Sequence, residues 1–88
     1  MHIVVHGRVQ GVFFREFVKR KAQVLGITGT AKNTPEGTVD IIAEGEPDAL
    51  KALIIECGHG PSQAEVKRVE PTEETYTGQF TSFSISYS

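Results

Sequence analysis

The spacing of apolar residues along the chain changes from two to three or four near residue 14. Ile3, Val5 and Val9 fall on one side of a two-residue repeat whose other side is mostly polar, which predicts a strand over residues 3–9. Spacings of three and four then predict an amphipathic helix over residues 14–25, ended by Gly26. Its apolar stripe consists of Phe14, Phe17, Val18, Ala22 and Leu25. Residues 7–15 are therefore expected to form a tight loop and the first helical turn.

Two alternating segments further along flank a reversal of the chain. The turn Thr34-Pro35-Glu36-Gly37 predicts that residues 27–33 and 38–44 pair as a hairpin. A second helix is expected to begin at Glu46-Pro47-Asp48, because proline suits the first helical position and acidic side chains suit the positive end of the dipole. Its apolar stripe consists of Leu50, Leu53, Ile54 and Cys57, and the glycines of residues 58–61 are expected to end it.

The last third of the chain predicts a strand over residues 64–69, a polar connection over residues 71–78 and a final strand. In that final strand Phe83, Ile85 and Tyr87 alternate with serines, and Tyr87 is interpreted as a residue at the edge of the core. The order β-α-β-β-α-β with one further strand predicts a ferredoxin-like α+β sandwich, an antiparallel sheet of four to five strands with two helices packed on one face. At 88 residues, we expect one domain over residues 1–88.

Charge and composition narrow the class of partner. The net charge of -2 and the pI near 5.9 lack the basic surplus of nucleic-acid-binding proteins, so no nucleic acid is expected. The basic run Lys19-Arg20-Lys21 lies late in the first helix and is interpreted as a solvated face. Residues 1–6 are too short and polar for a signal peptide, and no apolar run approaches membrane-spanning length. We expect a cytoplasmic monomer without a membrane partner.

Few side chains outside the first loop carry reactive chemistry. Cys57 is the only cysteine and falls on an apolar stripe, so it is interpreted as a buried thiol in a reducing compartment. His2 and His6 share one face of the first strand without a third ligand nearby, which favours solvent-facing histidines over a metal site. The sequence also lacks a carboxylate cluster near the loop that would hold magnesium. No metal and no cofactor are expected.

The strand-loop-helix junction is the strongest candidate for a binding site. Backbone N–H groups at a helix N-terminus favour an anion, and Arg15 in the first turn opposes the helix dipole unless an anion compensates it. The alternative is that Arg15 pairs with Glu16 or a distant carboxylate, while Gly11 is simply a turn residue. Asn33 ends the second strand; it is either a second residue of this site or a side chain that closes its own turn.

Longer motifs around these residues resemble those of a known family. Val5-x-Gly7-x-Val9-Gln10-Gly11-Val12-x-Phe14-Arg15 resembles the signature of acylphosphatases, and Gly29-x-Ala31-Lys32-Asn33-x-x-x-Gly37-x-Val39, followed by Gly45, resembles their second motif. The likeness continues through Gly60-Pro61, Ala64-x-Val66 and Phe83-x-Ile85-x-Tyr87, and so covers nearly the whole chain.

The resemblance implies a small cytoplasmic hydrolase of carboxyl-phosphate anhydrides, with an acyl phosphate as substrate and inorganic phosphate as a product. By matching position, Arg15 would bind the phosphate and Asn33 would orient water. The phosphate-binding loop would comprise Gln10, Gly11, Val12, Phe13, Phe14 and Arg15. Two positions depart from the family pattern, because Thr30 stands where an aromatic residue is usual and Phe13 where a smaller one is frequent.

These residues suit phosphoryl transfer without a covalent intermediate. Positioning and charge stabilisation are its main requirements, and an acyl phosphate leaves as a carboxylate that needs no general acid. Asparagine does not titrate, so a phosphate oxygen of the substrate is the expected proton acceptor. The alternative is a non-catalytic phosphate- or anion-binding regulatory module of the same fold, because ferredoxin-like folds host many functions.

Overall fold

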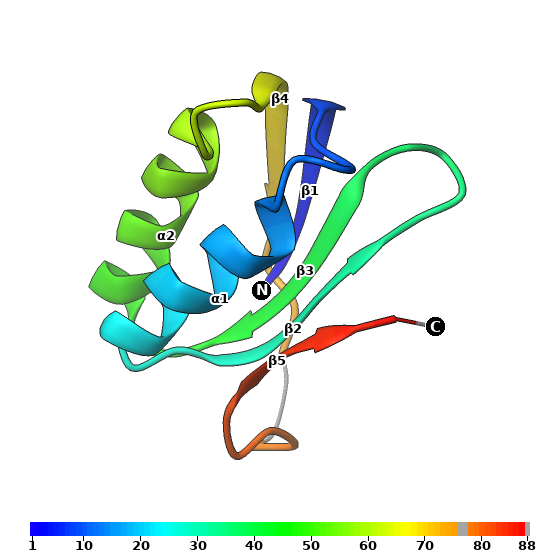
Figure 1. The fold of residues 1–88 in the computed structure, drawn as a ribbon. Coiled ribbons are helices and arrows are strands. Elements are labelled where there is room, and N and C mark those ends of the chain that lie inside the picture. Colours follow the sequence, from blue (N-terminus) through cyan, green and yellow to red (C-terminus); the bar gives the residue numbers. More distant parts are fainter. Residues whose placement is uncertain (76–77, 88) are drawn as a thin grey trace.

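A computed structural model of the protein describes residues 1–75 and 78–87. Seven elements follow one another in the order that the sequence predicts (Figure 1). They are β1 (His2–Arg8), α1 (Phe14–Val24), β2 (Thr28–Asn33), β3 (Val39–Glu44), α2 (Pro47–His59), β4 (Glu65–Thr72) and β5 (Phe83–Ser86). The ferredoxin-like α+β architecture is confirmed.

The five strands form one sheet in the order β4-β1-β3-β2-β5. β3 is antiparallel to both β1 and β2, so β1 and β2 run in the same direction on either side of it. β5 is parallel to β2 and adds a strand at the edge. The sheet is therefore mixed, and the prediction of an antiparallel sheet was wrong for this last strand. β5 does not pair with β4, the strand before it in the sequence. It lies at the opposite edge of the sheet, where Phe83 pairs with Gly29 of β2.

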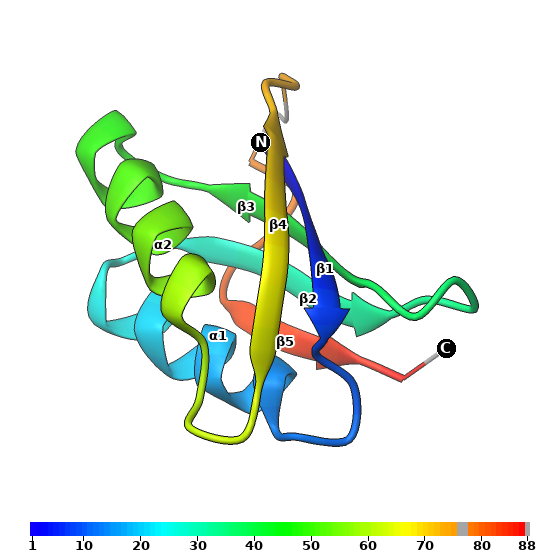
Figure 2. The ribbon, with the colours of Figure 1, turned by 90° about the horizontal axis from the view of Figure 1, so that it is seen from above.

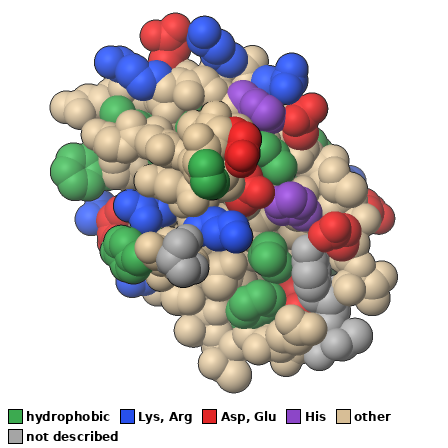
Figure 3. All heavy atoms as spheres, turned by 90° about the vertical axis from the view of Figure 1, so that its right-hand side faces the viewer, with side chains coloured by type: hydrophobic (Ala, Val, Ile, Leu, Met, Phe, Trp, Pro, Cys, Tyr) green, Lys and Arg blue, Asp and Glu red, His purple; other side chains and the backbone are tan. Residues whose placement is uncertain are grey.

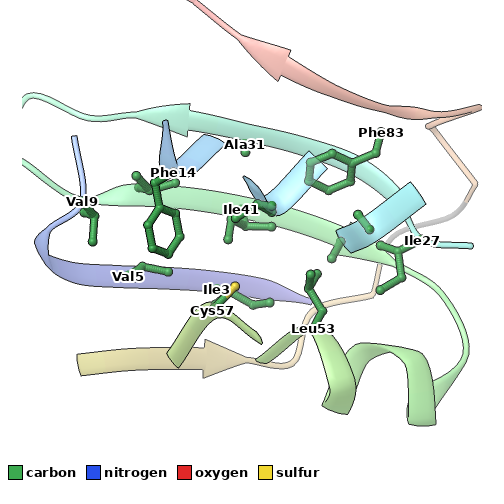
Figure 4. Close-up of a cluster of buried hydrophobic side chains, with 14 of the residues drawn as sticks. Ile3, Val5, Val9, Phe14, Ile27, Ala31, Ile41, Leu53, Cys57 and Phe83 are labelled. Atoms are coloured by element: carbon green, nitrogen blue, oxygen red, sulfur yellow. The ribbon is translucent and has the colours of Figure 1, made fainter. Parts of the chain in front are cut away.

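Both helices pack on one face of the sheet, and the core lies between them and the strands (Figures 1 and 2). The side chains of alternate strand residues meet the apolar stripes of the helices there (Figure 4). Members of this core include Ile3, Val5, Phe14, Val18, Ile41, Leu53, Cys57 and Phe83. No described residue forms a helix on the opposite face of the sheet, which explains the one-sided alternation of the strands.

β4 and α2 end later than expected. β4 continues to Thr72 and includes Pro71, which pairs with Ile3. A proline is tolerated there because β4 is an edge strand, where a missing N–H leaves no neighbour unpaired. α2 continues through His59, and Gly60 with φ 68° follows it. The polar connection therefore begins after residue 72, and its residues 76–77 lie outside the described residues.

The Cys57 thiol is part of this core, as the sequence predicts. Its side chain has no exposed surface, and in Figure 4 it points from α2 toward the strands. Burial, with a smaller contribution from the nearby Glu56 charge, raises the pKa of the thiol to about 12. Since the thiolate is the nucleophile, Cys57 is an inert core residue at neutral pH.

We expect the folded protein to resist modification of Cys57 by a water-soluble disulfide reagent at pH 8, because the thiol is both buried and protonated. The thiol should react within minutes in concentrated urea, as followed by absorbance of the released chromophore. An Ile55→Cys variant is the positive control, since Ile55 lies on the same helix and is 62% exposed. Equally rapid reaction of both thiols in buffer would contradict the packing of α2.

Candidate functional site

Three strands run in the same direction and end at the same edge of the sheet. β1 and β2 are both antiparallel to β3, and β5 is parallel to β2. Their C-terminal ends therefore lie toward one side of the molecule, as Figure 2 shows. β1 leads into residues 9–13 and α1, β2 ends at Asn33, and β5 is followed by Tyr87. The topology alone thus brings together segments that are more than 50 residues apart in the sequence.

The loop between β1 and α1 turns sharply at two residues with positive φ. Gly11 has φ 73°, as a turn glycine allows, and Phe13 has φ 63° and ψ 27°. Phe13 is the only non-glycine residue with positive φ in the described chain. A left-handed conformation costs a residue with a Cβ roughly 1–2 kcal/mol. The loop is therefore held in its shape by its surroundings.

The N-terminus of α1 is open toward this loop. No side chain caps the helix, and the first helical bond runs from the Phe17 N–H to the Phe13 carbonyl. Within the part of the chain that the structure describes, no backbone N–H of residues 11–16 donates a hydrogen bond to another group. Free N–H groups at the positive end of a helix dipole form an anion-binding site.

The first residue of α1 is anchored in the core. Phe14 is only 1% exposed, and its ring points toward the strands in Figure 4. Gly60 at the end of α2 leaves room for this ring, since a Cβ at Gly60 would lie 2.9 Å from Phe14 Cε2. Both helices thus fix the position of the first turn of α1, and with it the direction of Arg15.

Arg15 does not pair with a carboxylate in the described chain. Glu16 Oε1 instead lies 3.7 Å from Arg20 Nε, one turn further along the helix. The Arg15 guanidinium carbon lies 4.9 Å from the centroid of the Tyr87 ring, and Nη1 donates a long hydrogen bond of 3.5 Å to the Ser86 carbonyl. β5 therefore supports the guanidinium without neutralising its charge.

The interpretation of Tyr87 as a core-edge residue was wrong. Alternation does place it on the same face as Phe83 and Ile85, but its side chain is 80% exposed. Tyr87 follows the last residue of β5, Ser86, and most of its ring faces solvent. Tyr87 instead lies over Arg15 and lines the same cleft.

Asn33 shares the helix-facing side of β2 with the buried Ala31. Its Oδ1 atom is buried and has no hydrogen-bond partner among the described residues. The side chain therefore does not close its own turn, because Thr34 and Thr38 make that turn with bonds of their own. A buried acceptor without a partner costs about 1–3 kcal/mol unless a ligand or water occupies it.

Gln10 joins the loop to the β2–β3 hairpin, a contact that sequence reasoning missed. Its side-chain Nε2 donates hydrogen bonds of 2.9 Å to the carbonyls of both Thr34 and Thr38. These carbonyls flank the turn that directly follows Asn33. The Gln10 side chain thus fixes the distance between the loop and Asn33, and no local pattern in the sequence signals such a long-range bond.

A cleft of about 570 Å³ lies between these segments. It is lined by Val9, Gly11, Phe13, Phe14, Arg15, Glu16, Arg20, Asn33, Ile85 and Tyr87. Arg15 and Asn33, the two catalytic candidates, therefore face one cavity. Val12, by contrast, turns its side chain into the core, and the Gln10 side chain points to the hairpin, so these two could contribute to ligand binding here only with their backbones.

Other candidate residues lie elsewhere. His2 Nε2 is 3.2 Å from Asp40 Oδ2 and His6 Nε2 is 2.6 Å from Glu70 Oε1, so each histidine is half-buried beside its own carboxylate. Figure 3 shows histidines beside acidic side chains on the side facing away from the helices. Among residues 1–75 and 78–87, no group of three His, Cys, Asp or Glu side chains is placed to hold a metal ion, and no described helix is both long and apolar enough to cross a membrane.

Thr30 lies on the helix-free face with Lys32, away from Asn33, as the strand alternation predicts.

The basic run at the end of α1 is also accounted for by surface contacts. Arg20 pairs with Glu16, and Lys21 Nζ lies 3.8 Å from Glu56 Oε2. These residues give no sign of a second anion site.

The chain resembles known proteins over nearly its whole length. Residues 1–85 match the family model described as acylphosphatase. The chain is 42% identical over 85 residues to an acylphosphatase of Methylococcus capsulatus, covering 97% of this chain and 92% of that protein. The crystal structure of acylphosphatase from Bacillus subtilis superposes with a TM-score of 0.93 at 37% identity, covering 98% of this chain and 96% of that one. T. kodakarensis HypF is also similar, at 33% identity and a TM-score of 0.87, over 99% of this chain and 12% of that chain.

We expect Gln10→Leu to lower the free energy of unfolding by about 1–2 kcal/mol, because it removes two hydrogen bonds at similar volume. Gln10→Glu should be less stable still at pH 7, since a carboxylate would face two carbonyl oxygens. At pH 4 the introduced carboxyl group is protonated and offers one hydrogen-bond donor. Gln10→Glu and Gln10→Leu should then have similar free energies of unfolding. Urea unfolding at both pH values measures these differences.

Gln23→Glu is the matched control, because Gln23 is an exposed glutamine on α1 whose side chain makes no hydrogen bond within the described chain. It should change stability by less than about 0.5 kcal/mol. If Gln10→Glu were as stable as the wild type at pH 7, the Gln10 side chain would not hold the hairpin.

Proposed function

Since the chain belongs to the acylphosphatase family, we propose that it hydrolyses carboxyl-phosphate anhydrides to a carboxylate and inorganic phosphate. One observation carries the assignment to this cleft. Within residues 1–75 and 78–87, an arginine without a carboxylate partner, a set of unbonded N–H groups and the buried, unpartnered Oδ1 of Asn33 lie around a single cavity. The first two favour a phosphoryl group, and the third favours a water molecule beside it.

The phosphoryl group binds at the N-terminus of α1. Backbone N–H groups from residues 11–16 donate to its oxygens, and the planar Arg15 guanidinium donates through two nitrogens at once. These donors face the equatorial oxygens, where charge is held as the bond to the acyl oxygen breaks. Tyr87 and the Ser86 carbonyl support the guanidinium, so little reorganisation is needed on binding.

Asn33 positions the attacking water. Its Oδ1 accepts a hydrogen bond from the water, and its amide nitrogen donates to a phosphoryl oxygen. An asparagine cannot remove a proton, so the water proton passes to a phosphate oxygen of the substrate. The Gln10 bonds to the hairpin set how far Asn33 stands from the loop, and therefore how well the water is aligned.

The bond changes balance without a protein nucleophile. The water oxygen forms a bond to phosphorus while the bond from phosphorus to the acyl oxygen breaks. The acyl group leaves as a carboxylate with the bonding electron pair, and the products are a carboxylate and inorganic phosphate. Because a carboxylate is a stable leaving group, no general acid is required. Among the described residues that line the cleft, the only carboxylate is that of Glu16, which is paired with Arg20.

We expect Arg15→Ala to lower kcat/KM for benzoyl phosphate about a thousandfold or more, and to weaken inhibition by inorganic phosphate, because it removes both binding and charge stabilisation. Arg15→Lys should recover only a small part, since a lysine lacks the two-nitrogen fork. Steady-state kinetics with phosphate as a competitive inhibitor measure both effects. Unchanged phosphate affinity in Arg15→Ala would contradict the assignment.

Asn33→Ala should lower kcat about a hundredfold or more while phosphate inhibition changes less than threefold, because Arg15 and the N–H groups make most of the phosphoryl contacts and Asn33 mainly holds the water. Lys32→Ala is the matched control, since Lys32 is the exposed neighbour on β2 and faces away from the cleft. It should leave both constants near the wild-type values. A folded wild type that binds phosphate but releases none from benzoyl phosphate would make the chain a phosphate-binding module instead.

We also expect turnover to need no metal ion, because Arg15 and the N–H groups supply the charge stabilisation and the leaving group needs no Lewis acid. After treatment with a chelating resin, kcat/KM should stay within about twofold in EDTA. Turnover that disappears in EDTA and returns with added magnesium would contradict this part of the proposal.

A further inference from the structure

Phe13 places an apolar ring in solvent at the mouth of the cleft. The residue is 80% exposed, whereas its neighbours Val12 and Phe14 are buried. It adopts the left-handed conformation that glycine or asparagine accommodates more easily. The ring therefore gains little from packing and stands at the most strained residue of the loop. Strain of this kind at a binding site points to a function for the side chain.

The ring lies where a substrate would extend beyond its phosphoryl group. Phe13 lines the same cleft as Arg15 and Asn33. It also borders a second groove of about 520 Å³, which the apolar side chains of Phe17, Val24 and Pro61 line in part. Space for a ligand thus exists on two sides of the ring.

The direction of attack selects Phe13 over the other exposed ring. In an in-line displacement the leaving group departs opposite the attacking water. The register Lys32↔Ser86 places Tyr87 beside Asn33, on the strands that hold the water. Phe13 comes from the loop instead, and its ring is not engaged by a cation as Tyr87 is by Arg15.

We propose that the Phe13 ring is the binding surface for the acyl group, and that this chain therefore favours acyl phosphates whose acyl group is aromatic over those with a small aliphatic one. The inference rests on the proposed function. Apolar contact and ring-on-ring packing with Phe13 would lower KM for an aromatic substrate. The phosphoryl contacts would be the same for both substrate classes.

The test compares benzoyl phosphate with acetyl phosphate. Phe13→Asn removes the ring and keeps a residue suited to the left-handed conformation. It should lower kcat/KM for benzoyl phosphate about 5- to 30-fold, mainly through KM. The losses for acetyl phosphate and for inhibition by inorganic phosphate should be several-fold smaller than the loss for benzoyl phosphate, so that the ratio of the two kcat/KM values falls. Phe13→Tyr keeps a ring and should keep the preference for benzoyl phosphate over acetyl phosphate, and Ile55→Ala is the control for loss of a distant exposed apolar side chain.

Proportional losses for both substrates, or no loss for either, would overturn the proposal, because the ring would then shape the loop or do nothing. A binding measurement tests the proposed aromatic subsite separately from turnover. Calorimetry with benzoylphosphonate and acetylphosphonate, which are not hydrolysed, should show tighter aromatic binding in the wild type that Phe13→Asn abolishes. If this preference held in a wild type without turnover, the proposed hydrolysis would fail and the aromatic subsite would stand.

Discussion

The shared direction of β1, β2 and β5 is the constraint on which the rest of the site depends. β3 is antiparallel to both of its neighbours, so β1 and β2 end at the same edge, and the parallel β5 ends there as well. The loop with Arg15, Asn33 and Tyr87 are each the continuation of one of these strands. Had β5 been antiparallel to β2, Tyr87 would lie at the opposite end of the sheet and Arg15 would lack its aromatic support.

Several features of the cleft each lower the stability of the folded chain by a small amount. The helix has no side-chain cap, Phe13 is held in a left-handed conformation, and Asn33 Oδ1 is buried without a partner in the described chain. Each feature costs on the order of 1 kcal/mol or somewhat more. The buried Phe14 ring and the two bonds of Gln10 offset part of this, because they fix the two ends of the same loop.

Local patterns predicted the elements and the loop, and failed where distant segments meet. The spacing of Phe14, Val18 and Ala22 was sufficient to predict α1 and the face of it that is buried. The direction of β5 and the exposure of Tyr87 depend on how the chain returns after β4, which no spacing within β5 encodes. Pro71 likewise seemed to end a strand, because only the sheet order reveals that β4 is an edge. The side-chain role of Gln10 required knowing that the hairpin lies beside the loop.

The cleft offers a charged region and an apolar region, and hydrolysis would divide the substrate into one product for each. The N–H groups and Arg15 attract charge at its base, and Phe13 offers apolar surface at its mouth. Under the proposed function, an intact acyl phosphate would contact both regions through one molecule, so the association entropy would be lost only once. After cleavage the carboxylate would keep only the apolar contact, and inorganic phosphate would keep only the charged one. Each product therefore binds with part of the substrate's contacts, and a chain of net charge -2 gives neither anion further long-range attraction. Such an arrangement favours release of both products without a moving lid.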